Sequence, residues 1–156
     1  MTDTGLSANR KPFDLQLGQS VPLSVLVHRT RRLAVFATGF VAYRNGFSFL
    51  LYVAQRERPA DSVAAKRGSN INAYNVNLLV TGPDNMRLEV EADDLGGGGA
   101  GWRQLRYFVL ALPPTGPMTM TLEWPGRRSI SVSVPLDSRA VLAAASKARY
   151  LWPEAN

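Results

Sequence analysis

The side chains that most often carry enzyme chemistry are scarce in this chain. It has no cysteine and a single histidine, His28. This excludes disulfides, thiolate metal sites, cysteine catalysis and sites built from several histidines. His28 lies between Val27 and Arg29, with no acidic neighbour in the sequence to orient its imidazole as a general base requires. We therefore expect His28 to have a structural role.

Motifs for nucleophiles and nucleotides are also missing. The chain has no Gly-x-Ser-x-Gly sequence, and Gly68-Ser69 lies in a polar stretch with no strand before it, which argues against a hydrolase nucleophile. The glycine run 96–101 leads to Trp102 and a strand pattern, whereas a phosphate-binding loop leads into a helix. Asp93-Asp94, just before the run, would repel phosphate. We predict a flexible hairpin connection here and no cofactor.

The acidic residues do not have the spacing of a metal site or a glycosidase site. Calcium needs six to eight oxygen ligands, many of them from clustered carboxylates, and the loop aspartates lack Asp-x-Asp spacing. Glu89 and Glu91 share one strand face, which we expect to face solvent rather than a cleft. The sequence predicts no catalytic, cofactor-binding or metal-binding residue, and no enzyme activity. The loop aspartates are Asp84, Asp93, Asp94 and Asp137.

Positive charge is the remaining chemical signal. The 156 residues include 18 Lys and Arg and 12 Asp and Glu, a net charge of +6, and the whole excess lies in residues 1–70. Such a charge is also ordinary for a soluble domain. If the loop around residue 30 and the loop 56–70 converge, they form a basic rim that would hold nucleic acid or another polyanion through its phosphates. The candidate polyanion-binding residues are Arg29, Arg31, Arg32, Arg56, Arg58, Lys66 and Arg67.

The elements that must position these residues are β-strands, because apolar residues recur with a period of two through most of the chain. In residues 33–43 this pattern places Phe36 and Phe40 on the face opposite Val35. Asn45-Gly46 predicts a hairpin turn whose two residues have positive φ. We predict an all-β fold, an antiparallel two-sheet β-sandwich of immunoglobulin-like or related Greek-key topology with about eight strands. A jelly roll or a small barrel is the alternative.

The period changes only near the C-terminus. Asp137 or Ser138 can cap a helix over residues 139–150, which carries an apolar stripe and is ended by Pro153. Phe13, Leu15 and Leu17 are the apolar residues of a polar lead-in and can dock on the body. We predict three parts: a flexible N-terminal arm (residues 1–20), a β-sandwich domain (21–136) and a C-terminal helix packed on the sandwich (137–152).

We expect no signal peptide at the start of this sequence. Its first eleven residues are polar, and no run reaches the ~18 apolar residues of a membrane span. We therefore expect no membrane span and a cytoplasmic location.

Aromatic and aliphatic residues are plentiful for a sandwich of this size. An exposed strand face or the closing helix can make an interface with a protein partner or a second copy of the chain. The alternative is that the helix and the N-terminal arm cover that face within one chain. Phe36, Phe47, Phe49 and Tyr52 are expected in the core, which leaves few rings to stack on single-stranded nucleic acid.

Four stretches of the sequence form a recognisable combination of motifs. They are residues 37–47 with Tyr43-Arg44-Asn45-Gly46-Phe47, the glycine run, residues 112–125 with Pro-Pro-x-Gly-Pro and Glu-Trp-Pro, and the Ala-rich helix ending in Leu151-Trp152-Pro153. Together they resemble a family of small uncharacterised actinobacterial β-sandwich proteins, over roughly residues 20–154. The resemblance implies the fold and the boundaries of the folded region, and it supplies no catalytic or binding residues.

The leading functional expectation is a non-enzymatic protein-interaction or assembly module that acts with a protein partner or as a homo-oligomer. The alternative is binding of nucleic acid or another polyanion through the basic N-terminal half. Both rest on side-chain chemistry, because a sandwich fold by itself does not fix a function.

Overall fold

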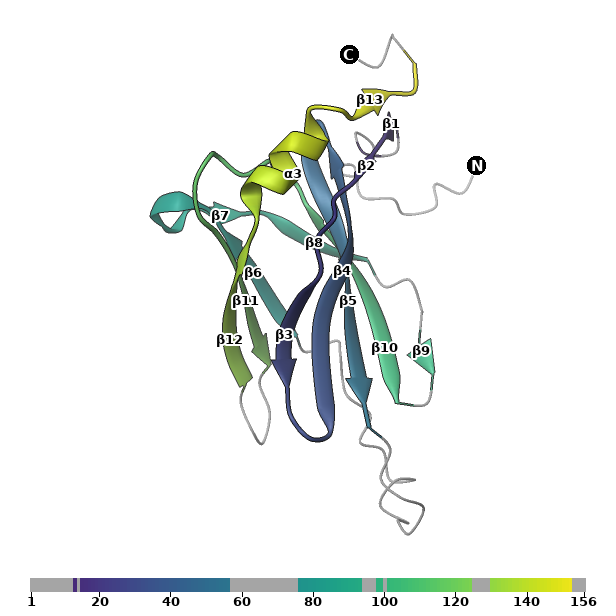
Figure 1. Ribbon diagram of the computed structural model, residues 1–156, viewed down its shortest axis with the longest axis vertical. Helices are drawn as coiled ribbons and strands as arrows, with labels where there is room; N and C mark the ends of the chain where they lie inside the picture. Colours follow the sequence, from purple (N-terminus) through teal and green to yellow (C-terminus); the bar gives the residue numbers. More distant parts are fainter. Residues whose placement is uncertain are drawn as a thin grey trace, which may run out of the picture.

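The computed structural model is a sandwich of two antiparallel sheets with one helix lying across an end (Figure 1). This confirms the predicted all-β sandwich with a C-terminal helix. The structure describes residues 13, 15–56, 76–93, 98, 99, 101–124 and 130–152. No helix within these residues is long and apolar enough to cross a membrane.

The large sheet has the strand order β2-β4-β5-β10-β8, with β3 also paired to β4 and β9 paired to β10. Neighbouring strands run antiparallel, as expected where no helix separates consecutive strands. The part of the glycine run that the structure describes pairs with the start of β10. The strands are β2 (Gln19–Ser20), β3 (Val25–Arg29), β4 (Leu33–Tyr43), β5 (Gly46–Gln55), β8 (Val90–Asp93), β9 (Gly98–Gly99) and β10 (Trp102–Val109).

The small sheet has the order β12-β11-β6-β7. Its last strand connects the two sheets. β7 pairs with β6, and after Glu89 the same extended stretch continues as β8, which pairs with β10 in the large sheet. The chain therefore changes sheets within residues 87–93. The strands are β6 (Asn77–Thr81), β7 (Arg87–Leu88), β11 (Met118–Trp124) and β12 (Ile130–Leu136), and the 3-10 turn η2 (Pro83–Asn85) joins β6 to β7.

The core between the sheets is rich in aromatic rings. Phe49 on β5 stacks on Phe40 at a centroid distance of 5.1 Å, on Phe47 at 6.4 Å and on Tyr107 at 5.6 Å. The small sheet contributes the fully buried side chains of β11 and β6, which come from alternate positions as a half-buried sheet requires. These are Val80, Met118, Met120 and Leu122.

A bulge in β4 corrects the expected position of Phe40. Val35 and Ala37 face the core, but Gly39 has a φ of 63° and the pairing with β5 shifts between Thr38 and Val41. The extra residue reverses the alternation. Phe40 therefore faces the core instead of the side opposite Val35, and only 1% of its surface is exposed.

The β4–β5 turn also differs from the expectation. The two central residues are Arg44 and Asn45, while Gly46 is already the first residue of β5 and pairs with Tyr43. Neither Asn45 nor Gly46 has a positive φ, so the prediction of two positive-φ turn residues is wrong. Glycine is needed at position 46 for space, because a Cβ atom there would collide with the carbonyl oxygen of Val109.

Helix α3 (Ser138–Ala145) closes one end of the sandwich (Figure 1). The Asp137 side chain caps it by accepting a hydrogen bond from the Ala140 N–H at 3.1 Å. The helix is shorter than the expected range 139–150, because the chain turns after Ser146 into β13 (Arg149–Tyr150), which pairs with β1 (Gln16–Leu17). Arg44 Nε donates to the Ala148 carbonyl at 2.9 Å and holds this turn.

The N-terminal segment packs on the sandwich. Phe13 is 3% exposed, and its ring lies 5.0 Å from that of Tyr43 and 5.6 Å from that of Phe108. Residues 15–20, expected as part of a flexible arm, form β1 and β2, which pair with β13 and β4. Leu15 and Leu17 remain exposed. Pairing with distant strands, which a local pattern does not show, explains the difference.

Candidate interaction face

The outer face of the large sheet carries a row of aromatic rings from three neighbouring strands. Phe36 stacks on Tyr52 at 5.1 Å with an angle of 4° between the rings, and Tyr52 stacks on Trp102 at 6.4 Å and 25°. Leu26 lies opposite Phe36 on the edge strand β3. Leu26 is 55% exposed and Trp102 is 42% exposed. We call Leu26, Phe36, Tyr52 and Trp102 the aromatic face.

The aromatic face exists because these rings point away from the core. Phe36 alternates with buried Val35, and Tyr52 lies between buried Leu51 and Val53. The ring faces of Phe36, Tyr52 and Trp102 cover one another, which is a favourable arrangement for cross-strand aromatic residues. The ring edges and the Leu26 side chain remain at the surface.

The other end of the same outer face is covered by the chain itself. Phe13 lies against Phe108 and Tyr43, and Ser48 on the central strand beneath is 6% exposed. Phe13 thus shields the part of the large sheet near the β4–β5 turn. The aromatic face lies toward the opposite ends of these strands, near the β3–β4 turn.

The outer face of the small sheet is different in chemistry. Thr121 on β11 shares a hydrogen bond of 2.8 Å with Ser133 on β12, and both lie at the surface. The outward positions of these two strands are occupied mainly by short polar side chains, which are normal for a sheet face in water. They include Thr119, Thr121, Ser131 and Ser133. The described outward positions of β11 and β12 therefore carry no aromatic ring, in contrast to the aromatic face, and the half-buried Leu79 on β6 lies opposite Thr121.

The predicted basic residues that the structure describes gather at one end of the sandwich. Thr30 Oγ1 accepts from the N–H groups of Arg32 and Leu33 and shapes the β3–β4 turn, and the Arg56 N–H donates to the Arg32 carbonyl at 2.8 Å. The end of β5 therefore lies against this turn. The predicted residues Arg58, Lys66 and Arg67 lie outside the described residues. We call Arg29, Arg31, Arg32 and Arg56 the basic end.

All four arginines of the basic end are exposed. None of their side chains makes a hydrogen bond or ion pair with a residue in the described part of the chain. The basic end borders the aromatic face, because Arg29 lies opposite Ala34, Ala34 opposite Ala54, and Ala54 opposite Trp102. Exposed guanidinium groups thus flank exposed aromatic edges.

The sequence interpretation missed part of this face. Phe47 and Phe49 are fully buried, as expected, but Phe36 and Tyr52 lie on the outer face rather than in the core. The alternation of Phe36 with Val35 was a usable signal. Tyr52 gave none, because β5 is apolar at almost every position and its two faces look alike in the sequence.

The other candidate residues are scattered. His28 is half-buried on β3, and its side chain makes no hydrogen bond with the residues described. Arg44 lies at the end opposite to the basic end, where its guanidinium is 5.8 Å from the centre of the Tyr150 ring. Asp84, Asp93 and Asp137 belong to different segments, and no group of three His, Cys, Asp or Glu residues within the described ranges is close enough to hold a metal ion.

No protein-family model matches the chain, and no curated protein is similar to it. The resemblance to the actinobacterial family therefore stays a prediction.

Proposed function

We propose that this protein is a non-enzymatic protein-interaction module that binds an acidic, partly apolar segment of a partner protein on its aromatic face. The observation that carries the proposal is the contrast between the two outer faces. One presents mainly serine and threonine from β11 and β12, and the other presents Leu26 and a row of three stacked rings. Exposed aromatic and aliphatic side chains in one patch are typical of interaction surfaces.

The rigidity of the aromatic face supports this assignment. Its rings come from β4, β5 and β10, which pair over most of their length in the middle of the large sheet. A partner that binds there loses little free energy to the ordering of these side chains, because the rings already hold one another in place. This arrangement favours a docking surface over an incidental cluster of apolar residues.

The charge around the face selects the partner. The exposed arginines of the basic end border the aromatic face, and none of them forms an ion pair with an acidic residue in the part of the chain that the structure describes. Guanidinium groups at the rim of an interface favour carboxylates across it. A second copy of the chain is less suitable, because it carries the same net charge of +6 and would be repelled.

Site-specific crosslinking tests this proposal. Gln104 lies opposite Tyr52 in the sheet, next to the rings. A photoreactive benzoylphenylalanine at position 104 should crosslink, in the native cell, to one protein whose attached peptide combines Asp or Glu with apolar residues. The double substitution Leu26→Ser and Trp102→Ser should reduce the crosslinked product about tenfold or more, since central aromatic residues dominate interface energies.

The matched control places the same photoreactive group at Ser133, on the outer face of the small sheet. It should yield no such product. The proposal fails if both positions crosslink the same protein, if the product persists in the double variant, or if the product is nucleic acid or a second copy of the chain.

A second candidate function is binding of a polyanion at the basic end. The hydrogen bond from Arg56 N to the Arg32 carbonyl favours it, because this contact brings two separate arginine segments together. For a single-stranded DNA 20-mer, the triple change of Arg29, Arg31 and Arg32 to Ala should reduce the magnitude of the negative slope of log K against log salt by about 2. The variants Arg139→Ala and Arg149→Ala change arginines at the end of the sandwich that α3 covers, and they should leave the slope unchanged. An unchanged slope in the triple variant would remove this candidate.

A further inference from the structure

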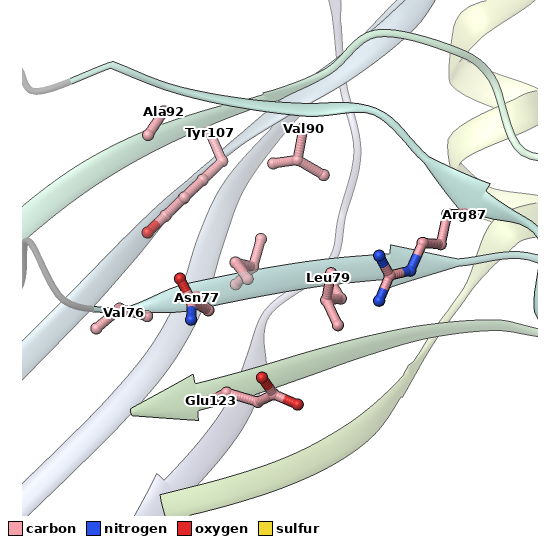
Figure 2. A pocket seen from close by; sticks show the side chains of 9 residues that line it. Val76, Asn77, Leu79, Arg87, Val90, Ala92, Tyr107 and Glu123 are labelled. Atoms are coloured by element: carbon pink, nitrogen blue, oxygen red, sulfur yellow. The ribbon is translucent and has the colours of Figure 1, made fainter. Parts of the chain in front are cut away.

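A pocket opens at the side of the sandwich where the chain changes sheets. β7 pairs with β6 only at Val80 and Thr81, and from Val90 onward the chain belongs to the large sheet. The first residues of β6 (77–79) have no partner in β7, and they diverge from β8. The space between them is a pocket of about 410 Å³ (Figure 2), within the usual size range of small-molecule sites.

Tyr107 supplies a polar group to the lining of this pocket. It extends from β10 on the inner side of the large sheet and is 4% exposed, and its ring stacks on Phe49. Its hydroxyl points into the pocket (Figure 2) and makes no hydrogen bond with any residue that the structure describes. No buried side-chain oxygen or nitrogen among the described residues lacks a hydrogen-bond partner, so the Tyr107 hydroxyl is accessible from the pocket, and a bound ligand must replace the hydrogen bond that it makes with water.

Burial raises the pKa of Tyr107 to about 12. The phenol therefore stays protonated at any physiological pH, and it can both donate and accept a hydrogen bond. A group with these properties suits a neutral hydroxyl or carbonyl of a ligand better than a cation.

The rest of the lining separates apolar from charged chemistry. Figure 2 shows Asn77 near the Tyr107 hydroxyl, Arg87 at the opposite end, and Leu79 and Val90 between the two ends. The Arg87 guanidinium is the only cation that lines the described pocket, and it suits a carboxylate. Glu123 lies opposite Asn77 in the small sheet, so a second anion at that end would be repelled.

We propose that this pocket binds a small monocarboxylate with a flat apolar body and a neutral hydroxyl or carbonyl group at its far end. Arg87 pairs with the carboxylate, Leu79 and Val90 contact the apolar body, and Tyr107 with Asn77 meets the far polar group. Glu123 excludes dicarboxylates. The site is separate from the aromatic face, and its test does not depend on the proposed protein partner.

Titration of the ¹⁵N-labelled protein by NMR tests the site, with 4-hydroxyphenylacetate as the probe. We expect saturable shifts that centre on the amides of Leu79, Val90 and Tyr107. Tyr107→Phe should weaken this binding about five- to tenfold, the effect of one hydrogen bond. For phenylacetate, which lacks the hydroxyl, wild type and Tyr107→Phe should bind equally.

Two further comparisons locate the carboxylate. Exposed Arg87 can change to Gln without loss of the fold, and Arg87→Gln should weaken both probes by about tenfold. A probe with a second carboxylate, 4-carboxyphenylacetate, should bind only to Glu123→Gln. The proposal is overturned if no probe gives saturable shifts, if the shifts centre elsewhere, or if Tyr107→Phe weakens phenylacetate as much as its hydroxylated analogue.

Discussion

Replacement of Phe49 by alanine should lower the free energy of unfolding by about 3–5 kcal/mol. Phe49 has no exposed surface and stacks on three other rings, those of Phe40, Phe47 and Tyr107. Its removal opens a cavity at the centre of the large sheet, where neighbouring rings on paired strands cannot move in to fill the space. Urea unfolding followed by tryptophan fluorescence measures the loss.

Tyr52 provides the matched control for Phe49, on the same strand but on the opposite face. Tyr52→Ala removes the contacts with Phe36 and Trp102 and leaves the core intact. We expect a loss of about 1–2 kcal/mol, the size of two cross-strand ring contacts. If Tyr52→Ala destabilises the protein as much as Phe49→Ala, the ring is part of the core and the aromatic face is not a free surface.

The second large effect is expected at Gly46. Gly46→Ala should lower the free energy of unfolding by about 1–3 kcal/mol. The new methyl group would collide with the Val109 carbonyl oxygen and lie 2.8 Å from Cζ of Phe13. The Val109 carbonyl is part of the backbone of β10, which is paired with β5. Relief of the collision therefore requires that two central strands separate locally. Thermal unfolding by circular dichroism measures the loss.

Gly82→Ala is the control for Gly46→Ala. Gly82 has a φ of −92°, and a Cβ atom there would lie 3.4 Å from the nearest atom, Cδ of Pro114. This is an ordinary contact distance, so we expect a change within about 0.5 kcal/mol. Equal effects of the two substitutions would show that the close approach of Gly46 to β10 is not what requires glycine.

The sequence predicted the fold class because the signal repeats. Period-two alternation over many segments and one terminal stretch of Ala and Val with a capping Asp137 are local patterns, and the sandwich and helix follow from them. The bulge at Gly39 was not predictable in the same way. A glycine in a strand fits either a continued strand or a bulge, and the pairing with β5 decides between them.

The two surfaces were predictable to different degrees. The arginines of the β3–β4 turn are easily found in the sequence. Successive turns of an antiparallel sheet lie at opposite ends, which fixes the end of the sandwich at which these arginines lie. The aromatic face could not be predicted from the sequence. Nearly every residue of β5 is apolar, and only the register shows that Tyr52 points outward. The pocket depends on a change of sheet near Glu89, which has no turn residue to mark it.

The contact between the two ends of the described chain has a consequence for biosynthesis. β1 pairs with β13, and Arg44 donates to the carbonyl of Ala148, 104 residues later. Ribosomes add about 5–20 residues per second, so these partners emerge roughly 5–27 s apart. During that interval the nascent chain holds β1 without its partner strand and the end of the sandwich without its helix. This end of the fold can therefore close only after α3 and β13 have left the exit tunnel.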